Sequence, residues 1–491
     1  MDTELKFTLN NIIRKKPFRI AVIGGGISGL SSAHRLAELS LKYSVPLEII
    51  VLEKSGKLGG VISSKSVNNF IIEEGPDSFN INKQSAINLC HRIGMNSDII
   101  HANDKAKQIF VIYRENLLPI PEGFLLAPTR LIPFLNSPLF SLKGKMRILM
   151  DIVIPRRNSQ KDESVASFIK RRFGKEAFKL VAQPLFSGIY STDPDMLSMQ
   201  ATMPHFIKME QEHGSIIWAM RNKIKLNDTE NKNGASSNNP YVSFKRGMQD
   251  LVNTLASYIP KESIQLNKVV QEITLKEDGW KIVTSNKNEI DVNGVIIATP
   301  SIHAATFVRG FDPLLADYLL GIKYTSSVII NLVYKREDIP HPLNGSGFVV
   351  PESEDLPILA CTFSSVKFPR CTPPEMVLLR CYMGGAINPD IYEEDDTSLN
   401  NAAHKSICGV LGIRSKPIFT MISRNPQSMP QYTVGHLDHI SQIYYMIKKY
   451  PGLQLAGNAY EGVGIPDCIR SGENAAEKLF EFIQHGENIA N

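Results

Sequence analysis

The sequence predicts an α/β fold in which helices pack on a parallel sheet, and three observations support this prediction. An apolar run over residues 18–23 ends at a glycine-rich turn, and a helical pattern follows at once. A second apolar run, over residues 47–52, ends at Glu53. The order of strand, glycine-rich turn and helix returns at the end of the chain, over residues 453–472.

The first turn has the spacing G-x-G-x-x-G, formed by Gly24, Gly26 and Gly29. Gly24 permits the tight turn, Gly26 lets the backbone approach a pyrophosphate, and Gly29 lets the helix pack closely on the strand. The helix N-terminus offers unpaired N–H groups to the phosphates. We therefore expect a dinucleotide to contact Gly24, Gly25, Gly26, Ile27, Ser28 and Gly29. The alternative is a turn that only packs helix on strand.

Glu53 and the residues after it indicate which dinucleotide binds. Glu53 stands 24 residues beyond Gly29, where an acid at the end of the second strand can accept hydrogen bonds from an adenosine ribose. The pair Gly59-Gly60 follows, and then an extended stretch that ends at Gly75-Pro76. Chain extended beneath the first turn favours a longer cofactor, so FAD is favoured over NAD. Taken alone, Gly75-Pro76 is better interpreted as a plain turn.

Length and composition place the chain among ordinary globular proteins. Its 491 residues suggest two to four domains, and its 54 basic and 49 acidic residues give a net charge of +5. That mild excess suits an anionic ligand or surface without requiring nucleic acid. The six cysteines include no C-x-x-C pair, so we expect reduced thiols in a cytoplasmic compartment and no metal site. Residues 1–17 do not resemble a signal peptide, and no apolar run is long enough to span a membrane.

The apolar run over residues 291–300 is a buried strand that we expect to rejoin the first sheet. Residues from about 80 to 240 are then an excursion from a nucleotide-binding core of the two-dinucleotide-fold type. The predicted segments are the first part of the FAD-binding core (1–80), an inserted, mainly helical domain (81–240), the return of the core (241–321), an α+β substrate domain (322–440) and the C-terminal part of the core (441–491).

The inserted domain carries an apolar segment beside basic helices. Four prolines over residues 117–135 prevent one continuous helix, and basic residues dominate positions 143–175. These features suit a peripheral contact with an anionic membrane or the mouth of a pocket for an anionic, apolar ligand. They equally suit a core loop beside a solvated, charged face. We expect a turn over residues 185–194 and a flexible surface loop over residues 226–240.

The glycine-rich block over residues 457–472 is predicted to precede a helix that runs to about Ile483. Pro466 suits the first turn of that helix. Its N-terminal N–H groups would stabilise the anionic reduced ring of a flavin. The alternative is an ordinary terminal helix that docks on the sheet.

Taken together, these motifs resemble those of the porphyrinogen oxidases of haem biosynthesis, which belong to the amine-oxidase-like flavoproteins. The resemblance spans almost the whole chain. The motifs that carry it are Gly24-Gly-Gly-Ile-Ser-Gly29, Lys57-Leu-Gly-Gly60, Glu74-Gly-Pro-Asp-Ser78, Ser187-Gly-Ile-Tyr190, Phe244-Lys-Arg-Gly-Met248, Met429-Pro-Gln-Tyr-Thr-Val-Gly-His436 and Gly457-Asn-Ala-Tyr-Glu-Gly-Val-Gly-Ile-Pro-Asp467. The last two are the specific ones. Asn458 stands where amine oxidases usually have an acid.

The resemblance implies the reaction and extends the site. The family oxidises a porphyrinogen, either coproporphyrinogen III or protoporphyrinogen IX, to the porphyrin, with electrons passed to dioxygen and peroxide released. No residue is implied as a required catalytic base. Substrate is expected near Gly188, Val349 and Phe368. Beyond the first turn and Glu53, the implied FAD contacts are Val61, Gly75, Pro76, Asp77, Ser78, Val270, Asn458, Val463, Gly464 and Ile465.

One departure from the family pattern leaves the choice of porphyrinogen open. Several relatives carry an arginine in the stretch that matches residues 107–110, where it can meet a substrate propionate, and this chain has none before Arg114. Lys107, Arg114 or a basic residue of the inserted domain would then bind the propionate. Two other functions remain open: an amine- or polyene-oxidising flavoenzyme of the same superfamily, and a flavin-binding partner protein without turnover. The sequence does not indicate the oligomeric state.

Overall fold

The computed structural model describes residues 17–124, 126–222 and 239–490, and a five-stranded parallel sheet lies at its centre. The strand order is β10–β2–β1–β14–β20. Four of these strands, β1, β2, β14 and β20, lie in the predicted runs. Strand β14 pairs with β1 as predicted, so the excursion does return to the first sheet. The strands are β1 (Phe18–Ile23), β2 (Leu47–Leu52), β10 (Ile264–Gln265), β14 (Gly294–Ile297) and β20 (Leu453–Leu455).

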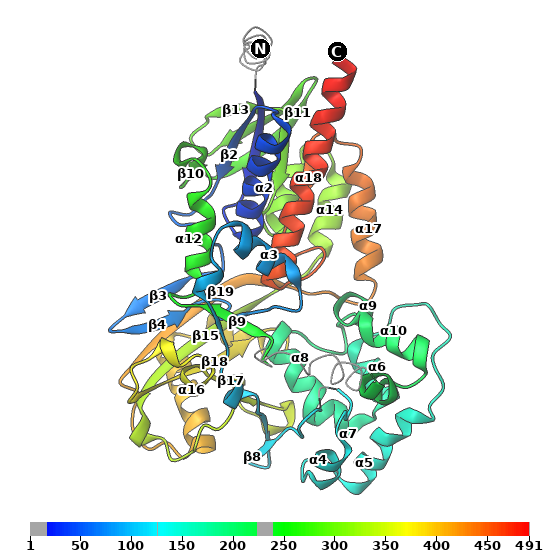
Figure 1. Cartoon of the computed structure of the whole chain (residues 1–491), viewed down its shortest axis with the longest axis vertical. Helices are drawn as coiled ribbons and strands as arrows, with labels where there is room; N and C mark the ends of the chain where they lie inside the picture. Colours follow the sequence, from blue (N-terminus) through cyan, green and yellow to red (C-terminus); the bar gives the residue numbers. More distant parts are fainter. Residues whose placement is uncertain (1–16, 125, 223–238, 491) are drawn as a thin grey trace, which may run out of the picture.

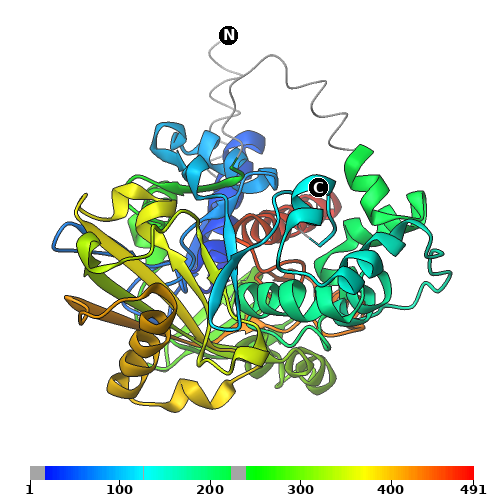
Figure 2. The ribbon, with the colours of Figure 1, turned by 90° about the horizontal axis from the view of Figure 1, so that it is seen from below.

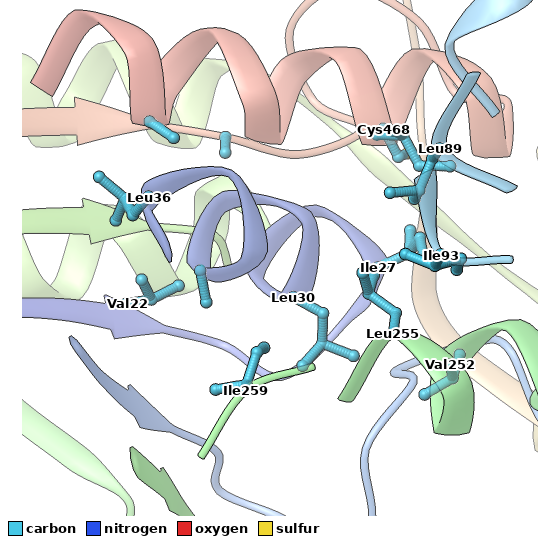
Figure 3. Close-up of a cluster of buried hydrophobic side chains, with 14 of the residues drawn as sticks. Val22, Ile27, Leu30, Leu36, Leu89, Ile93, Val252, Leu255, Ile259 and Cys468 are labelled. Carbon is cyan, nitrogen blue, oxygen red and sulfur yellow. The ribbon is translucent and has the colours of Figure 1, made fainter. Parts of the chain in front are cut away.

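Helices α2 (Ile27–Tyr43) and α18 (Ile465–Ala490) pack side by side on one face of this sheet (Figure 1). They join α12 (Gln249–Ser257) and α3 (Gln84–Arg92) around one apolar core, which contains Leu30, Leu36, Leu89, Val252 and Cys468 (Figure 3). The first and last thirds of the chain therefore share a single core.

Glycine makes the contact between the two long helices. A Cβ atom added at Gly472 of α18 would lie 2.2 Å from the carbonyl oxygen of Ser28 in α2. The Ser32 hydroxyl donates a hydrogen bond to the carbonyl oxygen of Gly472, at 2.9 Å. Gly29 has the same role between helix and turn, since its Cβ would lie 1.9 Å from the carbonyl oxygen of Gly24. The predicted role of Gly29 in close packing is therefore confirmed.

The opposite face of the sheet is covered by three helices and a small antiparallel sheet, which share a second core. Trp280 lies fully inside this core and donates a hydrogen bond to the carbonyl oxygen of Pro451. The elements are α13 (Ser301–Val308), α14 (Pro313–Gly321), α17 (His436–Ile447), β11 (Val270–Lys276), β12 (Gly279–Thr284) and β13 (Glu289–Val292).

A seven-stranded sheet forms the second layer, in the order β19–β15–β18–β17–β16–β7–β8. Helix α16 (Asp396–Leu411) packs on one of its faces, where Ile330, Leu332 and Leu379 belong to a buried core. Side chains alternate between the faces of a strand, so Asn331 and Arg380 lie on the other face. The strands are β7 (Ile109–Tyr113), β8 (Asn116–Pro119), β15 (Tyr324–Lys335), β16 (Gly347–Val349), β17 (Ile358–Phe363), β18 (Met376–Gly384) and β19 (Phe419–Pro430).

A helical region packs beside this sheet, and Figure 2 shows it in cyan and green to the right of the sheet when the molecule is seen from below. Its own core includes Phe134, Phe168, Phe173 and Phe206. The buried Asp151 and Arg172 form an ion pair inside it. The helices are α4 (Leu131–Asn136), α5 (Leu142–Leu149), α6 (Val165–Arg172), α7 (Lys175–Ala177), α8 (Gln183–Tyr190), α9 (Met199–Thr202) and α10 (Pro204–His213), with one π-helical turn over Phe178–Ala182.

The segment 81–240, expected as one inserted domain, is divided among four parts of the structure. Helix α3 packs in the core of the first sheet, and β7 and β8 extend the seven-stranded sheet by parallel pairing of β7 with β16. Short strands β5 (Phe79–Asn80) and β6 (Ile99–His101) pair with β9 (Tyr241–Phe244). Only the helices from α4 onward form the separate helical region. Strand pairing over such separations is not visible in local periodicity.

The turn expected over residues 185–194 is wrong in its first half, because residues 183–190 form helix α8. Gly188 therefore lies within a helix, and the chain turns at Ser191, which has a left-handed backbone. The absence of a continuous helix over residues 117–135 is confirmed, since the segment contains β8 and the short α4. The predicted surface loop over residues 226–240 lies, except for its last two residues, outside the described residues, as do residues 1–16.

Adding one methyl group at the contact between α2 and α18 should destabilise the protein. Gly472→Ala would force the two helices apart, and we expect a loss of about 1–3 kcal/mol in the free energy of unfolding, measured by thermal or chemical denaturation. Gly409→Ala in α16 is the matched control, because its Cβ meets no atom within 4 Å. There the change should stabilise the helix by about 0.5–1 kcal/mol. Equal effects at both positions would contradict the packing described.

Candidate active site

In the glycine-rich turn, two positions without room for a side chain are followed by one that is open. Gly24 has a left-handed φ of +111°, and a Cβ there would lie 2.7 Å from the carbonyl oxygen of Ala298. A Cβ at Gly25 would lie 2.6 Å from Leu58, whereas one at Gly26 would meet nothing within 4 Å. Helix α2 begins at Ile27, and no side chain caps the N–H groups of its first turn. The turn therefore offers open space beside unpaired N–H donors, as a pyrophosphate requires.

Glu53 lies beside this turn, where the sequence predicted the ribose acid. Its carboxylate accepts hydrogen bonds from the backbone N–H of Gly25, at 2.6 Å, and of Ser55, at 2.8 Å. The backbone N–H of Lys268 donates to the carbonyl oxygen of Glu53, at 2.8 Å. The chain leading to Val270 therefore runs beside Glu53, which places the start of β11 next to the expected adenosine end.

The segments after Glu53 stack against the turn. The backbone N–H of Gly59 donates to the carbonyl oxygen of Gly25, at 2.9 Å, and a Cβ at Gly60 would lie 3.5 Å from the Cα of Gly26. A Cβ at Gly75 would lie 1.7 Å from the carbonyl oxygen of Val61. The hairpin of β3 (Ser64–Val67) and β4 (Phe70–Glu73) makes this return possible. The structure therefore brings Gly26, Val61 and Gly75 into consecutive layers.

The C-terminal block reaches the same place. Tyr432 donates a hydrogen bond to the carbonyl oxygen of Asn458, at 2.5 Å, and accepts one from the backbone N–H of Gly462, at 2.7 Å. The Asn458 amide donates to the carbonyl oxygen of Ser428, at 3.0 Å. These bonds fix the turn that leads through Val463 and Gly464 to Ile465, the first residue of α18. Gly472 lies seven residues into α18, so its contact with Ser28 sets the N-terminus of α18 about 10 Å beyond that of α2.

These features fit FAD. Open space at Gly26 suits a pyrophosphate, Glu53 is placed for a ribose, and the layered strands extend the site toward the start of α18. When bound, FAD supplies hydride acceptance. The residues of this chain hold and orient it: the helix N-termini present N–H donors, and the paired backbones of residues 59–61 and 75 close one side.

A buried charge network holds the loop of residues 75–78 against the seven-stranded sheet. The Lys367 ammonium donates to both carboxylate oxygens of Asp77, at 2.9 and 3.0 Å, and to the Ser78 hydroxyl, at 2.9 Å. Arg380, on β18, donates to the carbonyl oxygen of Gly75, and its guanidinium lies 3.8 Å from the Asp77 carboxylate. Burial alone would raise the pKa of Asp77, but Lys367 and Arg380 lower it to about 2. Asp77 is therefore a charged anchor of this loop.

Glu73 lies near Asp77, but its pKa is shifted in the opposite direction. Burial raises the pKa of Glu73 to about 7, although hydrogen bonds from the Ser64 hydroxyl and the Met248 N–H act to lower it. Near neutral pH this carboxyl group is therefore only partly charged.

The structure brings two of the three expected substrate residues together. A Cβ at Gly188 would lie 3.4 Å from Ala360 and 4.0 Å from Val349, so α8 packs against β16 and β17. Val349, Ala360 and Tyr432 share one apolar cluster, against which Tyr190, Tyr382 and Val463 also pack. Phe368 lies elsewhere: it is 4% exposed and lines a small cavity with Asp77 and Arg380.

The sequence patterns named Asp77 and Ser78 but not the basic residues that pair with them, nor Asn331 beside Arg380. Arg380 and Asn331 each interrupt an apolar strand, and a polar residue inside such a run is a signal that could have identified them. Lys367 ends the short helix α15 (Ser364–Lys367) and gives no such signal. Among the residues named for propionate binding, Lys107 pairs with Asp104 at 3.0 Å, and Arg114 lies at the turn between β7 and β8.

Residues 27–479 match the family described as flavin containing amine oxidoreductase, and the chain belongs to that family. The chain is 31% identical over 466 residues to coproporphyrinogen III oxidase of Bacillus subtilis (strain 168), which covers 94% of this chain and 98% of the relative. The enzyme of that name from Staphylococcus aureus (strain NCTC 8325 / PS 47) is 33% identical over 470 residues, with the same coverage.

Among solved structures, the chain resembles "Putative protoporphyrinogen oxidase from Exiguobacterium sp. 255-15", with a TM-score of 0.84 and 27% identity over 95% of this chain and 99% of that one. Within its family the chain therefore groups with the porphyrinogen oxidases, as its motifs predict. The α/β fold and the FAD cofactor predicted from the sequence are confirmed.

Removing the charge of Glu53 should weaken FAD binding. In Glu53→Gln, the amide keeps the size of the side chain but loses the charged acceptor, which is worth about 1.5–3 kcal/mol. We expect the dissociation constant of FAD to rise about tenfold to a hundredfold, measured by reconstitution of the apoprotein. Glu48→Gln on β2 is the control, because its side chain is 45% exposed and paired with Arg19. Unchanged FAD affinity in Glu53→Gln would show that this acid does not contact the cofactor.

Glu73 should make stability fall as pH rises. Its carboxyl group loses its proton near pH 4.5 in the unfolded chain and near pH 7 in the folded one. Between these values the unfolded chain binds fewer protons, so the free energy of unfolding decreases as pH rises. Glu73→Gln removes this effect: it should match the wild type near pH 4.5 and exceed it by up to about 3 kcal/mol above pH 7.

Thermal unfolding across this pH range measures the difference between the two proteins. Glu337→Gln, whose side chain is 76% exposed, serves as the control and should show no such divergence. If Glu73→Gln follows the wild type at every pH, the carboxyl group titrates normally.

Proposed function

We propose that this protein oxidises coproporphyrinogen III to the porphyrin, with FAD as cofactor, dioxygen as electron acceptor and peroxide as by-product. This reaction is a late step of haem biosynthesis. The full-length similarity to two enzymes named coproporphyrinogen III oxidase is the observation that carries the proposal. Protoporphyrinogen IX is the second candidate, because the similar solved structure is described as a "Putative protoporphyrinogen oxidase".

The geometry supports a large, flat, apolar substrate. Helix α8 presents Gly188 to Val349 and Ala360, and Tyr190 and Tyr382 pack on the same cluster. Val463, from the turn before α18, also packs there, so this apolar wall adjoins the expected flavin. Because Gly188 in α8 has no side chain, α8 can lie close to Val349 and Ala360. A longer side chain at this position would project toward these two residues.

The chain's residues contribute orientation and exclusion of water to the reaction. Apolar and aromatic side chains from α8, β16 and β17 form the wall, and none of those named in it is an acid or a base. Hydride transfer to a bound flavin needs a held geometry and a dry site more than a proton-transferring side chain. The reaction therefore depends on where the macrocycle is held.

A peripheral contact with a membrane belongs to the same proposal. Seven exposed apolar residues cluster on α4, α5 and the turn that follows, at the end of the molecule farthest from the free ends of α2 and α18 (Figure 1). Lys143 and Lys145 lie among them on α5. These residues are Ile132, Leu135, Leu142, Met146, Met150, Ile152 and Val153, with exposures of 49–79%.

This surface, which we call the α4–α5 face, has the composition of an interfacial docking site on an anionic bilayer. The basic side chains would meet lipid headgroups, and Ile132 and Leu142 would enter the boundary of the acyl chains. In the part of the chain that the structure describes, no helix is long and apolar enough to cross a membrane. The contact would therefore be peripheral. The neighbouring residues Phe124 and Phe134 are buried, so the core-loop alternative holds for that part of the segment.

Comparing porphyrinogens tests the proposed reaction. Under anaerobic conditions, we expect coproporphyrinogen III to bleach the flavin absorbance of the purified protein faster than protoporphyrinogen IX, and amines to leave it oxidised. Admission of dioxygen should restore the absorbance and release peroxide. The proposed substrate is wrong if protoporphyrinogen IX reacts faster, and the reaction is wrong if only amines reduce the flavin.

The absence of a side chain at Gly188 gives a further test of the same site. Gly188→Leu should raise KM for the porphyrinogen at least about tenfold while the protein retains FAD, because the side chain would project toward Val349. Gly409→Leu in α16 is the control, since a Cβ there meets nothing within 4 Å. Loss of FAD from Gly188→Leu would mean that α8 supports the cofactor and not the substrate.

Vesicle binding tests the α4–α5 face. The holoenzyme should co-sediment with vesicles that contain phosphatidylglycerol and should do so less as salt concentration rises. The double variant Ile132→Ser and Leu142→Ser should lose this binding while keeping its activity on dissolved substrate. Leu41→Ser on α2, which is 82% exposed, is the control. Equal binding by all three proteins would contradict a docking role for this face.

A further inference from the structure

A small cavity lies between the loop of residues 75–78 and the face of the seven-stranded sheet that carries Asn331 and Arg380. It has room for about one or two groups the size of a water molecule. A flavin ring or a porphyrin cannot enter a space of this size. The lining residues are Ile71, Glu73, Asp77, Asn331, Ser364, Phe368, Arg370, Cys371, Leu378 and Arg380.

Four of the lining side chains have buried polar atoms without a hydrogen-bond partner. These atoms are Nε of Arg370, Nε of Arg380, the hydroxyl oxygen of Ser364 and both the nitrogen and oxygen of the Asn331 amide. Asn331 is fully buried, and Arg380 is 2% exposed. An unpaired buried polar atom is costly, and few native proteins gather several around one space. The cluster therefore indicates a bound group.

The unpaired atoms are mostly donors. Each arginine Nε carries one N–H, the Asn331 amide nitrogen carries two, and the Ser364 hydroxyl can donate as well. The Asn331 oxygen is the one acceptor among them that cannot also donate. A water molecule must donate as well as accept, whereas an anion only accepts. This set of atoms suits an anion better.

The charges around the cavity favour the same conclusion. Lys367, Arg370 and Arg380 bring three positive charges, against the carboxyl groups of Asp77 and Glu73. The Asp77 carboxylate already accepts hydrogen bonds from Lys367, and the Glu73 carboxyl group already accepts them from Ser64 and Met248. Burial raises the pKa of Glu73 to about 7, so near neutral pH this carboxyl group offsets only part of the positive charge.

We propose that this cavity binds a single small monovalent anion of the halide class, held by Arg370, Arg380, Asn331 and Ser364. Chloride or bromide is little larger than water and accepts hydrogen bonds from all sides. Phosphate and sulfate are too large for the space. Because Arg380 also donates to the carbonyl oxygen of Gly75, the anion would fix the residue that supports the loop expected to contact FAD.

Crystallography of the holoenzyme tests this proposal directly. Crystals soaked in sodium bromide, with data collected at the bromine absorption edge, should show an anomalous peak between Arg370, Arg380 and the Asn331 amide. Water density without an anomalous peak at this position would overturn the proposal, and so would density for part of the flavin. This measurement needs no variant, so it decides even if substitutions fail to fold.

Halide titration separates a built site from an adventitious ion. At constant ionic strength, exchange of gluconate for bromide should raise the thermal midpoint of the holoenzyme in a saturable way. Arg370→Gln should raise the bromide concentration at half effect about tenfold or more, because one charged donor is lost. Arg309→Gln, which removes an arginine that is 50% exposed and paired with Asp317, should leave it unchanged. A bromide peak without saturable stabilisation would mean an adventitious ion only.

Discussion

The structure depends on two backbone contacts that glycine alone permits. Gly29 touches the carbonyl oxygen of Gly24 and Gly472 touches that of Ser28, and a methyl group at either position would overlap its neighbour. The first contact seats α2 on its strand, and the second seats α18 on α2. Together they fix the N-terminus of α18 about two turns beyond that of α2, on the same face of the sheet. The expected FAD site, the apolar wall and the loop of residues 75–78 are arranged around these two helix ends.

Because side chains alternate along each strand, the two faces of the seven-stranded sheet have different roles. On one face, Ile330, Leu332 and Leu379 pack beneath α16 and supply apolar burial. On the other, Arg380 meets the loop of residues 75–78, Asn331 lies beside Arg380, and Tyr382 packs against the apolar wall. A shift of one residue in strand register would exchange these faces. The long pairing of β15 with both β18 and β19 makes such a shift costly.

Local sequence signals predicted the part of the fold that local rules control. The strand before Gly24, the helix after it, the strand before Glu53 and the final strand–turn–helix block all depend on neighbouring residues. Gly188 was misassigned to a turn because glycine usually marks a turn, whereas here it provides a close contact with β16 and β17. The pairing of β7 with β16 and of Asp77 with Lys367 joins residues more than 200 positions apart. No periodicity in a single sequence reports such contacts. The resemblance to a family, by contrast, drew on the whole chain.

The order of strands in the central sheet has a consequence for how the protein is made. Strand β20 is the last to join the sheet, and α18 follows it, so the cofactor site lacks one wall until residues 453–479 have left the ribosome. Earlier in synthesis, α2 has no partner for the face that Gly472 later covers, and its apolar residues stay exposed. Domains of large proteins generally fold as units while synthesis proceeds. This chain instead completes its first domain only after residues 453–479 have been made, so we expect FAD to bind after that point in synthesis.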